Sequence, residues 1–124
     1  MTEKIEDRKM MLIITHANDD TERANLALAL ATSMTSEDYD LVILFMFEGA
    51  MLAKKGVIET IEDGSLTPGR DLLPLLQEVN VPMYVCSPCA VKRGITEDDL
   101  IDGIKIISGP TAITMMPGRQ ILTL

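Results

Sequence analysis

The stretch Met10-Met-Leu-Ile-Ile-Thr15, followed by His16-Ala-Asn-Asp-Asp20, decides the predicted fold. The first part is a continuous apolar run rich in isoleucine, which is typical of a strand buried on both faces. The second part breaks that run, and either of its two aspartates can cap a following helix. The alanine and leucine content of residues Thr21–Met34 favours that helix. A buried strand, a polar loop and a helix together indicate the first unit of an α/β protein.

The rest of the chain repeats this alternation. We expect further strands at Leu41–Phe47, Val81–Val85, Ile104–Ile107 and Arg119–Leu124. We expect helices at Ala50–Lys55, at about Thr67–Val79, from the Cys86 motif to Lys92, at Glu97–Asp102 and at Pro110–Met115, and a surface loop over Val57–Leu66. Pro74 should kink or restart the second of these helices. Strands that alternate with helices imply a parallel sheet. The predicted fold class is therefore α/β, a three-layer, mainly parallel sheet of about five strands with helices on both faces, in one domain over residues 1–124.

The composition narrows the classes of function. Hydrophobic residues make up 47% and charged residues 24% of the 124 residues, as in ordinary globular proteins. The formal net charge of -8 disfavours binding to nucleic acid and to anionic membranes. The segment Met1–Lys9 is charged and lacks the apolar core of a signal peptide, and no apolar stretch is long enough to span a bilayer. We therefore expect a cytoplasmic protein.

Three polar or reactive residues directly follow predicted strands: His16, Glu48 and Cys86. The carboxyl ends of parallel strands meet at one edge of a sheet, where sites form, so we expect these residues to share that edge. His16 could deprotonate Cys86 or hydrogen-bond its thiolate, or could simply bond to loop backbone. Glu48 would raise a neighbouring thiol pKa unless it pairs with Lys54 or Lys55.

The motif Cys86-Ser-Pro-Cys89 lies between a predicted strand and a predicted helix. Ser87 suits the N-cap, and the proline after it suits the first helical position. Cys89 then falls in the first turn, where free N–H groups favour a thiolate, and Lys92 and Arg93 add nearby positive charge. Such surroundings lower a cysteine pKa from about 8.5 to roughly 3.5–7.5. The spacing therefore predicts reactive sulfur.

The residues leave several uses of this pair open. The cysteines could be small buried hydrophobes, carriers of a persulfide, or a dithiol that cycles with a disulfide as in thioredoxins. A zinc site needs four ligands, and the chain offers two cysteines and His16, so it would need carboxylates or a second chain. The loop after the first strand contains no glycine, so no nucleotide or flavin site is predicted. We accordingly predict neither a cofactor nor a bound metal.

Three segments resemble the DsrE/DsrF-like family of small sulfur-relay proteins: Ile14–Ala24, Phe47–Gly56 and Val85–Gly94. The third is the most specific. In the sulfur-carrying subunits of that family, the acceptor cysteine lies just after a strand, eight residues before the glycine of an Arg-Gly pair. Cys86 stands eight residues before Gly94, so the acceptor role maps onto Cys86. Cys89 has no match in those subunits.

The resemblance implies a parallel α/β fold, homotrimers or homohexamers, and persulfide transfer with sulfur donor and acceptor proteins. The prediction is therefore an intracellular sulfur relay of the sulfurtransferase-like kind, in which Cys86 accepts sulfane sulfur. Cys89 would help to pass it on, or would attack the persulfide and release sulfide. The supporting residues are His16, Ser87, Lys92 and Arg93. The alternative is a non-enzymatic oligomeric module that binds a metal or small ligand at the same strand ends.

Overall fold

The structure is a computed structural model that describes residues 8–124, so most of the charged N-terminal segment used to predict localisation lies outside the described residues. The described elements in chain order are β1 (Lys9–Ile14), α1 (Thr21–Ser36), β2 (Asp40–Phe45), the 3-10 helices η2 (Phe47–Ala53) and η3 (Ile58–Thr60), α2 (Gly69–Glu78), β3 (Met83–Cys86), α3 (Ser87–Lys92), the 3-10 helix η4 (Glu97–Asp99), β4 (Ile104–Ile107), α4 (Gly109–Thr114) and β5 (Gln120–Thr123). Within this range, no helix is long and apolar enough to cross a membrane.

The strands form one five-stranded sheet in the order β4-β3-β2-β1-β5. All four neighbouring pairs are parallel, with Leu12 opposite Ile43 between β1 and β2 and with Val85 opposite Ile106 between β3 and β4. The predicted α/β class is confirmed. Parallel pairing places the last residues of all five strands at one edge, which is where Cys86 ends β3.

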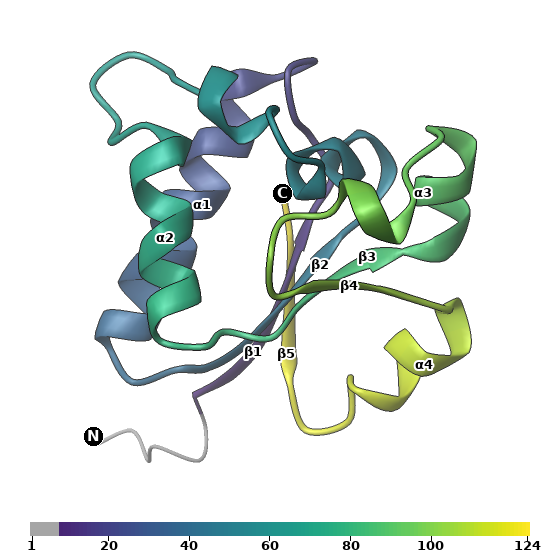
Figure 1. The fold of residues 1–124 in the computed structure, drawn as a ribbon. Helices are drawn as coiled ribbons and strands as arrows, with labels where there is room; N and C mark the ends of the chain where they lie inside the picture. Colours follow the sequence, from purple (N-terminus) through teal and green to yellow (C-terminus); the bar gives the residue numbers. More distant parts are fainter. Residues whose placement is uncertain (1–7) are drawn as a thin grey trace, which may run out of the picture.

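The two faces of the sheet are covered unequally (Figure 1). Helices α1 and α2 lie together over one face, and the main core between them includes Leu28 of α1, Leu76 of α2 and Phe45 of β2. The opposite face carries a smaller cluster that includes Met11 and Leu44, and among residues 8–124 the one helix that contributes to it is the six-residue α4, through Ala112. A parallel sheet normally has both faces buried, so the α4 face is under-covered in the single chain.

Local differences from the predicted elements have identifiable causes. Asp20 is the cap of α1, because its side chain accepts a hydrogen bond from the Arg23 N–H. Helix α2 begins at Gly69 and not at Thr67, since Pro68 has an extended ψ of 149°. Pro74 lies inside α2 without ending it.

The connections after β2 also differ. A helix was predicted over Ala50–Lys55, and the structure has the 3-10 helix η2 there, which begins three residues earlier at Phe47. The predicted surface loop over Val57–Leu66 contains the short 3-10 helix η3.

Candidate functional site

The cysteine motif joins β3 directly to α3, with no residue between the strand and the helix. Cys86 is the last residue of β3 and the N-cap of α3, and it has extended dihedral angles of φ -67° and ψ 126°. Ser87 is therefore the first helical residue. The sequence had suggested that it would be the N-cap. No side chain caps the start of α3, because Cys86 makes no cap hydrogen bond there.

The Cys86 sulfur is half-buried, and its surroundings favour the protonated thiol. Burial raises the pKa of Cys86; a hydrogen bond from the Cys89 backbone amide opposes this, and the adjacent Cys89 side chain adds to it. The expectation that the helix start would lower the pKa does not hold for Cys86. Helix α3 has only six residues, and the loss of water around the sulfur outweighs its amide donor.

Cys89 has a different environment, although it is also half-buried. Its side chain packs against the main core, and its sulfur accepts a hydrogen bond of 3.1 Å from the backbone N–H of Phe47. Phe47 has a φ of 52°, in the left-handed region that bulky residues rarely adopt. The role of Phe47 could not be predicted from residue type, because its donor is a backbone N–H that every residue except proline carries. The Phe47–Gly56 segment in the family resemblance was the one available signal.

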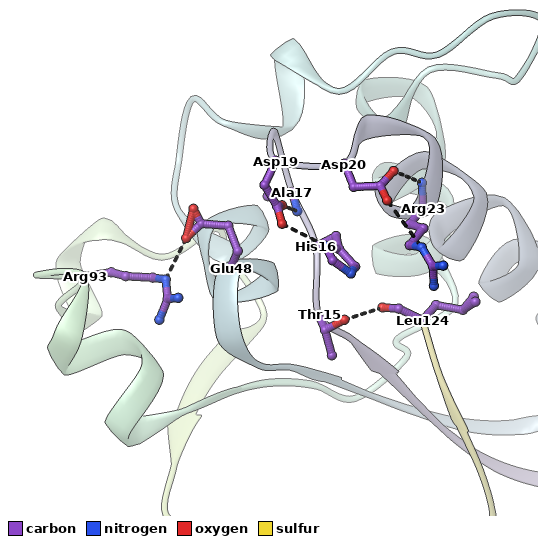
Figure 2. A network of polar contacts seen from close by, with 9 residues as sticks. All are labelled: Thr15, His16, Ala17, Asp19, Asp20, Arg23, Glu48, Arg93 and Leu124. Carbon is purple, nitrogen blue, oxygen red and sulfur yellow. Dashed lines mark hydrogen bonds and ion pairs between the residues drawn. The ribbon is translucent and has the colours of Figure 1, made fainter.

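An ion pair joins η2 to the residue that caps the end of α3 (Figure 2). Nε of Arg93 lies 2.8 Å from Oε1 of Glu48, and Nη1 of Arg93 donates to the Cys89 carbonyl at 3.1 Å. The partner of Glu48 is thus Arg93, and not Lys54 or Lys55 as expected. The Arg93 side chain is mostly buried at 19% exposure, whereas Lys92 points to solvent.

His16 is held by its own loop (Figure 2). Its Nδ1 lies 2.7 Å from Oδ2 of Asp19, while Oδ1 of Asp19 accepts the N–H of Ala17 at 2.8 Å. Burial opposes ionisation of Asp19, but the hydrogen bonds from Ala17 and His16 outweigh it and lower the Asp19 pKa. The ring is therefore fixed by a carboxylate side chain and not by loop backbone. Its role at Cys86 stays a prediction.

The strand ends thus place two sulfurs, one backbone donor and one ion pair at a single spot. The neighbouring Cys89 side chain raises the pKa of Cys86 through a hydrogen bond and through its charge, so the ionisation of one thiol depends on the state of the other. Adjacent thiols of this kind can close a disulfide, and a thiolate can attack an external sulfur. Within residues 8–124, no group of three or more histidine, cysteine or acidic side chains is arranged to hold a metal ion.

Comparison with known proteins gives relatives along nearly the whole chain. The uncharacterised protein MJ0989 of Methanocaldococcus jannaschii is 34% identical over 99 residues, which cover 79% of this chain and 82% of that protein. The uncharacterised protein MK0008 of Methanopyrus kandleri is 29% identical over 96 residues, which cover 77% of this chain and 75% of that protein. Neither name states an activity.

Solved structures share the fold. The ychN protein from E. coli superposes with a TM-score of 0.78 at 23% identity, over 94% of this chain and 99% of that one. Protein MTH1491 from Methanobacterium thermoautotrophicum superposes with a TM-score of 0.70 at 16% identity, over 94% of this chain and 98% of that one. In addition, the model of the DsrE/DsrF-like family matches residues 8–123. The protein therefore belongs to the DsrE/DsrF-like family.

Proposed function

We propose that this protein relays sulfur through a persulfide on Cys86, with Cys89 as the group that helps to pass or release it. The observation that supports this most directly is the pair of neighbouring, half-buried cysteines where β3 joins α3. The sulfur of Cys89 accepts a hydrogen bond of 3.1 Å from the Phe47 amide. Membership of a family associated with sulfur relay adds to it. Half-buried thiols at a strand edge suit exchange with a partner protein in a reducing compartment.

Sulfur is transferred to Cys86 in a first step and leaves it in a second. The Cys86 sulfur attacks the outer sulfur of a donor persulfide, the donor's sulfur–sulfur bond breaks, and the donor leaves as a thiolate. The Cys86 persulfide then has two fates. An acceptor thiolate can take its outer sulfur, or the Cys89 thiolate can attack the Cys86 sulfur, closing the Cys86–Cys89 disulfide as hydrosulfide leaves. Where the disulfide has closed, a dithiol reductant restores both thiols.

The test is intact-mass spectrometry after exposure to inorganic polysulfide. A gain of one sulfur atom is expected in Cys89→Ser, where the persulfide cannot resolve, and no gain is expected in Cys86→Ser. Zinc or iron bound in stoichiometric amount, with no sulfur gain in any variant, would overturn the proposal in favour of a metal-binding module.

We further propose that copies of this chain assemble through the under-covered α4 face, as a homotrimer or homohexamer. Ile113 of α4 is 62% exposed and Ile121 of β5 is 46% exposed, beside the half-buried Met115 and Met116. Burying this apolar surface would complete the second layer of the sheet. Light scattering should give a trimer or hexamer that Ile113→Glu dissociates, whereas Val79→Glu, at the exposed C-cap of α2, should leave the mass unchanged. A monomeric wild type would contradict this assembly.

A further inference from the structure

The backbone at Phe47 is strained, and the packing of its own side chain does not explain the strain. Phe47 has a φ of 52°, although its side chain is 60% exposed. Residues held in this region persist only where their surroundings over-determine the conformation, and such residues cluster at functional sites. The N–H of this residue donates to the Cys89 sulfur, 3.1 Å away, so the strained residue is also the one that contacts the sulfur.

Contacts on both sides hold this amide in place. Before it, the Met46 N–H donates to the Ile14 carbonyl at 3.0 Å, which attaches the start of η2 to the end of β1. After it, Glu48 pairs with Arg93 at 2.8 Å, and Arg93 also donates to the Cys89 carbonyl at 3.1 Å. The ion pair therefore holds η2 against the end of α3, next to Phe47, whose N–H donates to the Cys89 sulfur. We call this pair the clasp.

We propose that Phe47 is a positioning residue whose backbone amide, clasped by the Glu48–Arg93 pair, makes Cys89 the sulfur that carries the thiolate of the reduced pair. An N–H donor favours the ionised form of its acceptor, because hydrogen bonds to charged acceptors are stronger than those to neutral ones. Among residues 8–124, the titratable or charged groups that the contacts link to Cys89 are the adjacent Cys86 thiol, Arg93, which donates to the Cys89 carbonyl, and Glu48, which reaches Cys89 only through Arg93. Burial raises the pKa of the Cys86 thiol, which agrees with this order.

This assignment deepens the proposed function, on which its chemical consequence rests. When Cys86 attacks a donor persulfide, its proton passes along the hydrogen bond to the Cys89 thiolate, so no charged intermediate builds up on Cys86. Cys89 then loses this proton to solvent, and its thiolate attacks the Cys86 sulfur with hydrosulfide as the leaving group. Cys89 thus acts first as the base and then as the resolving nucleophile.

The order of ionisation can be measured without any sulfur donor, so it succeeds or fails separately from persulfide formation. In reduced Cys86→Ser protein, the amide resonance of Phe47 is followed by nitrogen–proton NMR while thiolate absorbance is recorded against pH. The two curves should share a midpoint, and that midpoint should lie below the one for Cys86 in Cys89→Ser. A Phe47 resonance that does not move with Cys89 ionisation, or a Cys86 that titrates first, would overturn the assignment.

Glu48→Ala separates positioning from simple electrostatics. Loss of the negative charge alone would lower the midpoint of Cys89, whereas loss of the clasp frees the Phe47 amide and raises it. We expect the rise, with a rate of Cys89 alkylation at neutral pH about fivefold lower than in the Cys86→Ser parent. The matched control is Glu59→Ala, which removes an exposed carboxylate from η3 and should change nothing. A faster reaction in Glu48→Ala would contradict the proposal.

Discussion

Gly49→Ala tests how tightly η2 is fitted to the end of β1. A Cβ atom at Gly49 would lie 2.0 Å from the Ile14 carbonyl oxygen and 3.1 Å from Thr15 Cα. The first separation falls about 1.4 Å short of the 3.4 Å at which ordinary contact begins. Both neighbours are backbone atoms, one in the last residue of β1 and one in the residue after it, where the sheet holds the chain, so we expect η2 to move. Overpacking of this kind destabilises by about 3 kcal/mol.

The shift would also reach the candidate site, because Glu48 and Phe47 directly precede Gly49. A displacement of an ångström or more would take the Phe47 amide out of hydrogen-bond range of Cys89. Urea unfolding followed by circular dichroism gives the loss in the free energy of unfolding, and the rate of Cys89 alkylation reports on the site. We expect both to fall in Gly49→Ala.

Two other glycines serve as controls for the same measurement. A Cβ at Gly109, in the first turn of α4, meets nothing within 4 Å, so Gly109→Ala should be neutral or stabilise by less than about 1 kcal/mol. A Cβ at Gly69 meets Ile58 Cδ1 at 3.1 Å, a flexible side-chain end, so Gly69→Ala should fall between the two. If Gly49→Ala unfolds at the same urea concentration as the wild type, the reasoning about η2 is wrong.

Three further predictions concern groups outside the cysteine pair. Asp20→Ala removes the N-cap bond to the Arg23 N–H and should lower the free energy of unfolding by about 1 kcal/mol; an unchanged urea midpoint would contradict the cap. The pKa of Asp19 is lowered in the folded protein, so its stabilisation is complete above about pH 4 and lost as pH falls through the lowered value. Asp19→Asn should therefore flatten the acid side of a stability–pH curve, and an unaltered curve would refute this. Arg119 donates to the Asp40 carbonyl at 2.7 Å and contacts its carboxylate at 3.1 Å, so Arg119→Ala should destabilise by about 1 kcal/mol in the same urea titration, and no loss would count against it.

Strands β1 and β2 could be predicted because their apolar runs, Met10–Ile14 and Leu41–Phe45, are continuous, as burial in the middle of a parallel sheet requires. The edge strand β4 carries the exposed Lys105 within its apolar run, and it still lies at the predicted residues Ile104–Ile107. The start of α2 was harder to place, since an extended Pro68 and a closely packed Gly69 decide it through contacts with distant residues.

The sequence was enough to predict which cysteines form the site and where they lie. It was not enough to predict how their surroundings shift their pKa values. Residue type and spacing mark Cys86 and Cys89, and parallel topology puts them at the carboxyl edge. The burial that raises the pKa of Cys86 depends on tertiary packing, which the motif does not encode. The Phe47 donor and the Glu48–Arg93 pair also arise from segments over 40 residues apart, so local patterns could not indicate them.

The claim that matters most is that a sulfur atom travels through Cys86. A donor carrying isotopically labelled sulfane sulfur, followed by alkylation, digestion and mass spectrometry, tracks that atom directly. We predict label on Cys86 in the Cys89→Ser protein, and label in released hydrosulfide together with a Cys86–Cys89 disulfide in the wild type. Label found on neither cysteine, or on Cys89 when Cys86 is serine, would contradict the account.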